Sequence, residues 1–569
     1  MGRRRSWVYR PVPPGDQNAS KVPLRTKAGC RYLRSKPPNS PDGQHWAHLP
    51  EIGHRSHEVI GGTDLPDNGW AAGSDRQIPA RRCLSIGIFI EVMNDGADQR
   101  QELTNPAGPP RQETGDALVV PGPLFQRADW MCFGLTAVVV LVVYLRTLAP
   151  EVTLEYSGAL STSAKYAGVA QPPGYPVWTL YSWLFVTLFP FSNIAWRVAV
   201  GSAVAAALAC GLVALMVSRA GAMILETTPA FASRKLSEQR LLRVVCGFVA
   251  GMVLGLSRTV WRMAVMAQTW ALTVFLFAIM LCLLLRWTGR PERRRFLYGA
   301  LFVFGLLLTG NQELFVMTPA LLLVVLLSDQ ELGRDLSVVI SLLVFADWVV
   351  SVLGLYYWLG SDMLRSVGLL VAFVLVGGAA VVAIVRTRRF GSEWKSASLC
   401  GVLFLLGLGF YLYLPFASMT NPPMNWGYAR TEEGFFHLIT RGQYERWHPT
   451  GELGRLIGQL WIVAKETGEG FGWPYFVFAA LPFGLLRRTG GCARRWLLGL
   501  AAVFVCVGPL MIGLLNPSED QIIDRVVIAP FFTAMYVILA LCTGLGLMVA
   551  GCMVAKIQTQ PQPDLVPRS

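Results

Sequence analysis

The chain has 569 residues, of which 53% are hydrophobic and 15% are charged, and its net charge is +14. Because soluble domains are about a quarter charged, this composition excludes an ordinary soluble domain and indicates a polytopic membrane protein. The positive charge gathers in an N-terminal tail and in short loops, without a basic–aromatic reader motif, so it does not indicate nucleic-acid binding.

Residues 1–125 are rich in Pro, Gly, Arg and Asp and have no sustained apolar period, which predicts a disordered tail. The first ten residues lack the apolar core of a signal peptide, and Met93 offers a later start for the native chain. We expect residues 126–552 to form the transmembrane domain and 553–569 a second disordered tail. The eleven cysteines contain no C-x-x-C pair, so we expect core residues rather than disulfides or zinc ligands. The sequence indicates no certain cofactor.

Twelve apolar runs follow the tail, and each predicts a spanning helix. They occupy residues 130–149, 196–218, 241–257, 265–286, 296–310, 314–327, 337–359, 364–385, 397–416, 472–487, 496–515 and 525–551. The two shortest, 296–310 and 314–327, are expected to be half-length helices that meet at a polar tip. The predicted fold is an all-α polytopic bundle of about twelve spans.

The topology depends on whether the aromatic run 174–191 crosses the membrane. If it does not, the basic short loops share one side, with 19 Lys and Arg: 219–243, 286–295, 328–336, 386–395 and 487–495. The short loops on the other side carry only 4: 150–195, 258–264, 311–313, 360–363 and 516–525. This asymmetry matches the positive-inside rule, from which the long loop 417–471 is exempt. We therefore expect 174–191 to be an interfacial helix and both termini to be cytoplasmic.

The first outward loop, within 150–195, holds a candidate site. Glu155 directly follows the first span as a candidate general base, with Ser157 in a turn beside it. Gln171 precedes a rigid Pro-Pro-Gly-Tyr-Pro corner that presents Tyr175. The alternative is a linking loop with an interfacial acid.

Two further outward segments carry polar residues that the apolar character of the chain does not explain. Arg258 and Arg262 lie on the less positive side with Arg197, and their planar donors suit a phosphate; the alternative is snorkelling at the interface. Gln268 is expected inside the following span. Asn311 and Gln312 form the tip between the two short helices, either as functional groups or as a helix cap.

The fourth segment runs from Tyr411 to Pro449 and mixes aromatic, amide and charged residues as carbohydrate sites do. Its candidate substrate-binding residues are Asn425, Trp426, Arg441 and Tyr444. Thr431 is expected to cap a short amphipathic helix. A loop packed on the membrane surface is the alternative.

These motifs, in this order, resemble a branch of the GT-C integral-membrane glycosyltransferases that includes the animal endoplasmic-reticulum protein O-mannosyltransferase. Many bacterial members were long catalogued only as a domain of unknown function. The family motifs match Tyr156–Ala159, Gly168–Pro176, Asn193–Val198, Asn421–Gly427 and Thr440–Tyr444.

The resemblance implies a GT-C-like bundle with an interfacial helix after the first outward loop. It also implies transfer of a hexose or mannose from a polyprenyl-phosphate donor to a protein or glycan acceptor, with inversion and a carboxylate base. A bacterial plasma membrane is the expected location.

The chain also departs from the family pattern. The motif acids of the first loop are replaced by Tyr156 and Ala159, and the family His by Gln171. Gln268 stands for a usual Glu, and Ala417 for a common Arg. Glu155 is then the carboxylate placed to act as base.

There are two alternatives to an active glycosyltransferase. One is a catalytically weakened relative that binds a lipid-linked sugar or joins an envelope complex as a membrane subunit. The other, a secondary transporter, predicts acids at mid-span and two related halves, and the sequence has neither feature.

Overall fold

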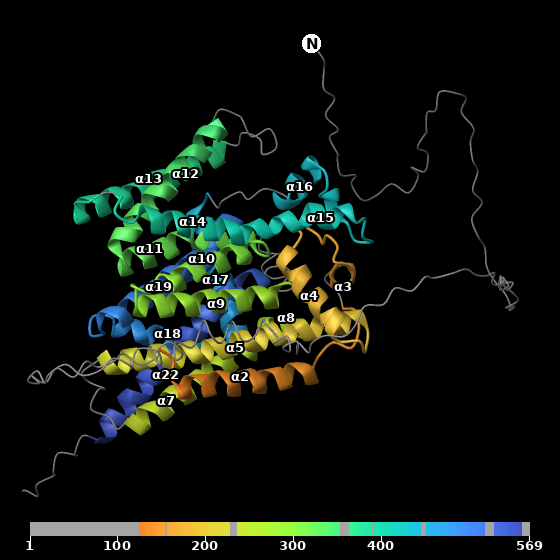
Figure 1. The fold of residues 1–569 in the computed structure, drawn as a ribbon. Helices are drawn as coiled ribbons and strands as arrows, with labels where there is room; N and C mark the ends of the chain where they lie inside the picture. The colour runs from red at the N-terminus through yellow and green to blue at the C-terminus, as the bar shows by residue number, and fades with distance from the viewer. Residues whose placement is uncertain are drawn as a thin grey trace, which may run out of the picture. The chain divides into compact units, whose positions relative to one another are not determined.

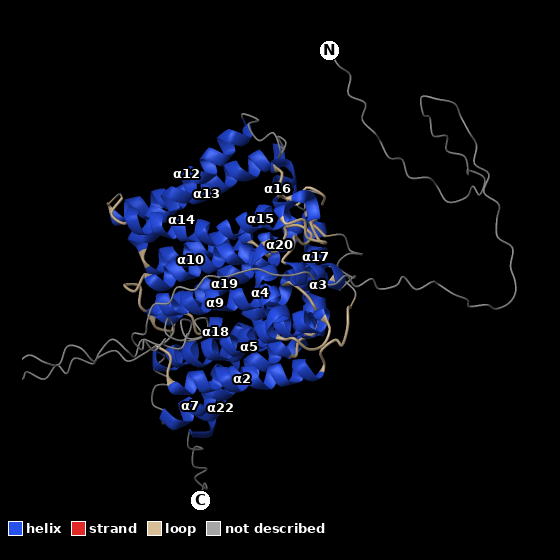
Figure 2. Cartoon of the chain, turned by 45° about the vertical axis from the view of Figure 1, so that its right-hand side comes forward, coloured by secondary structure: helices blue, strands red, loops and turns tan. Residues whose placement is uncertain are grey.

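The computed structural model describes residues 124–153, 156–227, 236–352, 363–389, 391–444, 451–517 and 529–559. Regular secondary structure within these ranges is helical, apart from one isolated parallel bridge between Val169 and Asn425 (Figure 1, Figure 2). Residues 1–123 of the predicted tail lie outside the described residues. Its last two residues, Leu124 and Phe125, already belong to the buried core.

The helices of the first half are α2 (Arg127–Arg146), α3 (Ser157–Tyr166), α4 (Pro176–Leu188), α5 (Ile194–Thr227), α7 (Leu236–Gly255), α8 (Arg258–Ala264), α9 (Trp270–Gly289), α10 (Arg295–Leu308), η1 (Gln312–Met317), α11 (Thr318–Ser328) and α12 (Gln330–Val352). Those of the second half are α13 (Met363–Thr387), α14 (Trp394–Leu408), η2 (Gly409–Leu412), α15 (Tyr413–Met419), η3 (Trp426–Tyr428), α16 (Glu432–Ile439), α17 (Leu453–Thr467), η4 (Gly468–Gly472), α18 (Trp473–Gly484), α19 (Gly491–Val505), η5 (Cys506–Leu510), α20 (Met511–Leu515), η6 (Ala529–Phe532) and α22 (Thr533–Thr559).

Among the described residues, seven helical segments are long and apolar enough to cross a membrane. An eighth results if α7 and α8, which meet at a 70° bend, form one span. The prediction of a helical membrane protein is confirmed. Each of the twelve predicted spans contains helix, but α10, α18 and the η1–α11 segment are shorter than the roughly 20 residues that a straight span requires. Length and hydropathy therefore support fewer spans than the twelve predicted.

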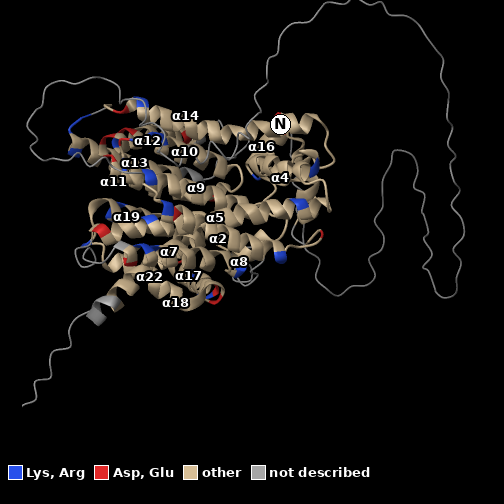
Figure 3. Ribbon diagram, turned by 60° about the horizontal axis from the view of Figure 1, so that its bottom comes forward, with Lys and Arg blue, Asp and Glu red and all other residues tan. Residues whose placement is uncertain are grey.

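The five basic loops meet at one end of the bundle, which we call the basic end. Gly490 packs against Thr227, and Cys492 Sγ lies 3.3 Å from the carbonyl oxygen of Thr288. Arg495 donates to the carbonyl of Ser328 at 3.5 Å. Figure 3 shows many of the charged residues gathered near α11, α12 and α13. The loops grouped by their Lys and Arg content thus lie together in space.

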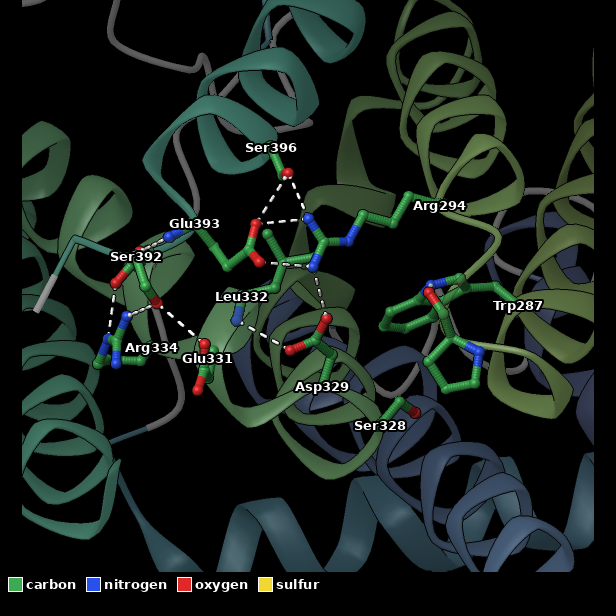
Figure 4. Close-up of polar contacts among 12 residues, drawn as sticks. Trp287, Arg294, Ser328, Asp329, Glu331, Leu332, Arg334, Ser392, Glu393 and Ser396 are labelled. Atoms are coloured by element: carbon green, nitrogen blue, oxygen red, sulfur yellow. Dashed lines mark hydrogen bonds and ion pairs between the residues drawn. The ribbon is translucent and has the colours of Figure 1, made fainter. Parts of the chain in front are cut away.

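An ion-pair network clamps three of these loops at the basic end (Figure 4). Arg294 donates to Glu393 Oε1 at 2.8 Å and to Asp329 Oδ2 at 3.4 Å. The hydrogen bond from Arg294 holds the pKa of the Glu393 carboxyl below its ordinary value. Arg334 is fully buried and donates to Ser392 Oγ at 2.8 Å. The network fastens the α12–α13 pair to α10 and α14.

The outward loops meet at the opposite end, which we call the site end. Asn193 Nδ2 donates to the carbonyl of Pro150 at 2.7 Å, and the backbone N–H of Ala149 donates to Val265 at 2.9 Å. Gln312 Nε2 donates to the carbonyl of Ile439 at 2.7 Å. Figure 1 shows α3, α4, α15 and α16 gathered on this side. Residues 360–362 of the predicted outward loop 360–363 lie outside the described residues.

The short pair α10 and η1–α11 forms a hairpin between the two ends. Arg294 precedes α10 at the basic end, and Ser328 closes α11 there. The connection at 309–312 lies at the site end, where Gln312 contacts α16. The predicted polar tip is therefore present, and its helices connect the two ends in spite of their shortness.

Helix α4 begins and ends at the site end. Its 13 residues extend for about 20 Å, less than the roughly 30 Å of a bilayer core. Tyr175 precedes it, and Arg197 of α5 donates to the carbonyl of Val186 near its other end at 3.2 Å. The helix packs against the start of α5, where the Tyr181 hydroxyl donates to the carbonyl of Gly201 at 2.8 Å.

Two predicted boundaries are wrong. The C-terminal tail was expected from 553, but α22 continues to Thr559 because its apolar sequence extends past Cys552. Gln268 was expected inside a span, whereas α9 begins only at Trp270. The carbonyl of Gln268 accepts from Trp178 Nε1 at 3.0 Å and from Ser202 Oγ at 3.3 Å instead of from its own helix.

Candidate active site

The first outward loop is closed by its own side chains. The backbone N–H of Thr153 donates to Ser157 Oγ at 3.4 Å, and Ser157 is almost fully buried at the start of α3. Tyr156 precedes this helix with a φ of 60°. Glu155, the predicted base, lies outside the described residues. Ser157 therefore links Thr153 to the start of α3.

The Gly168–Pro176 corner is hydrogen-bonded directly to the Asn421–Gly427 motif. The N–H of Val169 donates to the carbonyl of Met424 at 2.9 Å, and that of Trp426 donates to Val169 at 3.1 Å. A Cβ on Gly168 would lie 2.4 Å from the Met424 oxygen. Only glycine permits this approach. The close contact with Met424, about 250 residues later in the sequence, therefore explains the glycine of the motif.

Two amide oxygens at this junction are buried without a hydrogen-bond partner. They are Oε1 of Gln171 and Oδ1 of Asn425. The Asn425 amide is oriented by its nitrogen, which donates to the carbonyl of Ser418 at 3.2 Å. Buried polar atoms are nearly always paired, and a free acceptor oxygen suits a hydroxyl donor. The junction therefore holds two buried acceptor oxygens that no group of the described residues satisfies.

Tyr175, at the end of the corner, lies near the ion pair of Arg441 and Glu313. Its side chain hydrogen-bonds with Thr269, and the side chains of Arg441 and Tyr444 are near enough to act on it electrostatically. Burial raises the pKa of Tyr175 to about 12, although the Arg441 charge opposes the shift. The phenol is therefore neutral near pH 7 and acts as a hydrogen-bonding group, not as a base.

Arg441 forms an ion pair with Glu313 of the η1 tip. Glu313 is 4% exposed, so its carboxylate depends on the arginine for compensation. The guanidinium also lies 5.0 Å from the centre of the Tyr444 ring, a cation–π distance. We call Tyr175, Glu313, Arg441 and Tyr444 the Tyr175–Arg441 cluster.

The tip holds this cluster in place through its amides. Gln312 donates to the Tyr411 hydroxyl at 2.8 Å as well as to Ile439. Asn311 donates to Thr273 Oγ1 of α9. Both predicted residues therefore position the tip, and Glu313 is the tip side chain that meets Arg441.

Helix α16 and Trp426 complete the site. Thr431 caps α16 by accepting from the N–H of Gly434 at 3.1 Å, which confirms the predicted cap. Trp426 Nε1 donates to Gln443 Oε1 at 2.8 Å and thereby fixes the aromatic ring against the turn that carries Arg441.

Of the three predicted phosphate partners, Arg197 contacts the backbone around the end of α4. Arg197 donates to three backbone carbonyls, those of Phe191 at 3.0 Å, Val186 at 3.2 Å and Ser192 at 2.8 Å. It therefore fixes the turn between α4 and α5.

Arg258 and Arg262 lie one turn apart on α8, which faces a different set of helices. Thr259 hydrogen-bonds with Tyr536 of α22, and Arg258 and Glu466 lie near that tyrosine. Trp261 between the two arginines donates to Thr147 Oγ1 at 3.0 Å, which places α8 at the site end.

Three participating residues were not among the predicted site residues. Glu313 is a buried acid in an apolar run, a signal of function by itself. Thr269 directly follows the predicted Gln268. Tyr413, whose hydroxyl donates to the carbonyl of Ala167, had no such signal, because its partner is 246 residues away.

Residues 157–333 match a family model described as the N-terminal domain of the protein O-mannosyl-transferase TMEM260. The chain is also 30% identical over 181 residues to the Protein O-mannosyl-transferase TMEM260 of mouse, Mus musculus, across 31% of this chain and 23% of that protein. It thus spans about a quarter of the relative's length. No solved structure is significantly similar.

The matched segment contains α3, the corner, α8 and the η1 tip. It begins two residues after Glu155 and excludes Asn421–Tyr444, which the corner and the tip nevertheless contact. The family model confirms the resemblance to the mannosyltransferase-like membrane glycosyltransferases over residues 157–333, and the mouse relative agrees with it.

Proposed function

We propose that this membrane protein is a glycosyltransferase that moves a hexose, of the mannose class, from a polyprenyl-phosphate donor to a protein acceptor at the site end. The relative's name supports the sugar and the protein acceptor. The observation that carries the proposal is the junction between the corner and Asn425. There the amide oxygens of Gln171 and Asn425 are buried without hydrogen-bond donors, which sugar hydroxyls would supply.

In the proposed reaction, Glu155 takes the proton from an acceptor hydroxyl. The hydroxyl oxygen then forms a bond to the anomeric carbon, while the bond from that carbon to the phosphate oxygen breaks. The electron pair leaves with the lipid phosphate, and the configuration inverts. Gln171 and Asn425 bind sugar hydroxyls, and neutral Tyr175 positions the sugar beside Arg441.

Arg258 and Arg262 are the proposed partners of the donor phosphate, since both lie at the site end on α8 and a planar guanidinium suits a phosphate. Arg197 supports this indirectly by holding α4. Trp426 and Tyr444 offer aromatic faces to the sugar, while Ser157, Gln268, Asn311 and Gln312 position the surrounding elements.

We also propose the orientation. The basic end faces the cytoplasm with both termini, α4 lies in the membrane interface, and a GT-C-like bundle of about twelve spans results once the short helices are counted. A bacterial plasma membrane stays a prediction from the sequence.

The second candidate is a relative that binds the lipid-linked sugar without turnover, alone or as a subunit of an envelope complex. The replacement of the motif acids by Tyr156 and Ala159 favours it. Both candidates require the same sugar site and differ only in the role of Glu155.

The two candidates are separated in lipid nanodiscs with polyprenyl-phosphate [14C]mannose and a membrane-protein extract as acceptor. We expect protein-bound label with the wild type and a loss of about 10²–10⁴-fold in Glu155→Gln, the usual contribution of a general base. Glu292→Gln, an exposed change at the basic end, is the matched control. Donor that binds without transfer would support the non-catalytic relative, and an unaffected Glu155→Gln would remove the base assignment.

A further inference from the structure

A cavity of about 490 Å³ lies beside α3, on the flank that carries Lys165. Its walls come from Glu151 and Val152 of the first loop, one face of α3 and residues 193–195 at the start of α5. We call it the α3 pocket. Pockets of roughly 300–1,000 Å³ hold drug-sized ligands, so the space accommodates a short polypeptide segment.

The α3 pocket is distinct from the Tyr175–Arg441 cluster. The residues of α3 that line it are Gly158, Ser161, Thr162, Lys165 and Tyr166. Their spacing of three or four residues places them on one helical face. Leu160 and Ala164, on another face, belong to the hydrophobic core. Helix α3 therefore presents one face to the core and one to the pocket.

The pocket contains an unpaired buried hydroxyl. Ser161 is 5% exposed, and its Oγ has no hydrogen-bond partner. A serine on a helix ordinarily bonds to a backbone carbonyl one turn before it, as Thr162 does with Gly158 at 2.9 Å. Ser161 does not, so its buried hydroxyl keeps an unused hydrogen-bonding capacity in the wall of the pocket.

The rim carries one charge of each sign. Lys165 and Glu151 are both exposed and both line the pocket, so its charge is balanced. A phosphate donor needs an excess of positive charge, as at Arg258 and Arg262. A balanced rim suits a polyamide chain, whose C=O groups pair with the cation and whose N–H groups pair with the carboxylate.

Hydrogen bonds hold the walls of the pocket together, and the pocket residues flank the proposed base in the sequence. Asn193 joins its walls, because its Nδ2 donates to Pro150 at 2.7 Å and its Oδ1 accepts from the N–H of Trp196 at 2.8 Å. In the sequence, Glu155 lies between Val152 and Gly158, which both line the pocket.

We propose that the α3 pocket binds the acceptor polypeptide on either side of the residue that is glycosylated, with Ser161 and Lys165 as its recognition groups. The inference rests on the proposed glycosyl transfer. It assigns the acceptor to one flank of α3, and the sugar to the junction of Gln171 and Asn425.

The test measures two products in the nanodisc assay: label transferred to protein, and free mannose released to water, which needs no acceptor. Ser161→Leu fills the pocket, and Lys165→Met removes its cation. We expect each to raise the acceptor concentration for half-maximal transfer by about tenfold, with a much smaller change in mannose release. Lys395→Met, an exposed lysine at the basic end, is the matched control.

Equal loss of transfer and mannose release would assign the pocket to the donor and overturn the proposal. Transfer that is unchanged in both variants would also overturn it. If the wild type forms neither product, the proposed function fails, and crosslinking decides the pocket. For that arm, Tyr166 is replaced by benzoylphenylalanine and irradiated with the same extract. A polypeptide adduct that is lost on adding Ser161→Leu supports the pocket assignment; a lipid adduct, or an adduct indifferent to Ser161→Leu, contradicts it.

Discussion

The side chains of the candidate site differ in whether their polar atoms are paired. Gln312 and Arg441 are paired within the protein, with Ile439 and Glu313 respectively. The Gln171 and Asn425 oxygens are not. An unpaired buried acceptor costs roughly 1–3 kcal/mol of stability. The two unpaired oxygens at the junction of the motifs therefore cost stability, as expected if they serve the proposed sugar site.

Replacing Gln171 by Met tests this residue-scale conclusion. Because a buried, unpaired amide oxygen is removed, we expect an unchanged or higher melting temperature in a detergent thermal scan. The apparent KM for the sugar donor should rise about 2–10-fold, as for one lost hydrogen bond of roughly 0.5–1.5 kcal/mol.

Gln459→Met is the contrasting variant. Gln459 is buried but donates to Asn516 Oδ1 at 2.9 Å and to Pro517 at 2.8 Å. Its loss should lower the melting temperature and leave the donor KM unaltered. A destabilised Gln171→Met would mean that its amide is paired in the resting protein.

At the scale of elements, α7 is fitted to its neighbours by small residues four positions apart. A Cβ on Gly247 would lie 2.6 Å from the Ala214 oxygen, and one on Gly251 would lie 2.7 Å from the Cys210 oxygen. Such stripes let membrane helices approach closely. The G-x-x-x-G-x-x-x-G spacing is readable in the sequence, although the identity of the facing helices, α2 and α5, is not.

Gly251→Ala is therefore expected to destabilise the bundle by about 1–3 kcal/mol, the usual cost of overpacking. Gly134→Ala, on α2, is the matched control because no atom lies within 4 Å of its added Cβ; it should be neutral or stabilising. Thermal unfolding in detergent compares the two. Equal melting temperatures would show that α7 can move away from α2 and α5 without cost.

At the scale of the whole molecule, the two polar ends perform different tasks. The basic end is held by ion pairs such as Arg294–Glu393. The site end is assembled from loops that belong to distant parts of the chain. Orientation in the membrane would then decide which compartment supplies the proposed acceptor.

The proposed orientation predicts the labelling of introduced cysteines by a membrane-impermeant maleimide in intact cells. Glu433→Cys, exposed on α16, should react from outside, and Glu292→Cys only after permeabilisation. Native Cys30 and Cys83 are replaced by Ser in both. Reversed labelling would invert the proposed orientation, and labelling of both from one side would contradict the assignment of the two ends to opposite faces.

The sequence by itself determined the membrane class, the helical segments, the grouping of the basic loops and the Thr431 cap. Each of these depends on composition or on spacing within one segment, which local physics decides. Only the tertiary structure decided the roles of Arg197 and Glu313. Arg197, whose predicted phosphate contact stays a prediction, donates to the carbonyls of the α4–α5 turn, and Glu313 meets Arg441 across 128 residues. Such pairings depend on which helices pack together, a property of the whole chain that no local pattern carries.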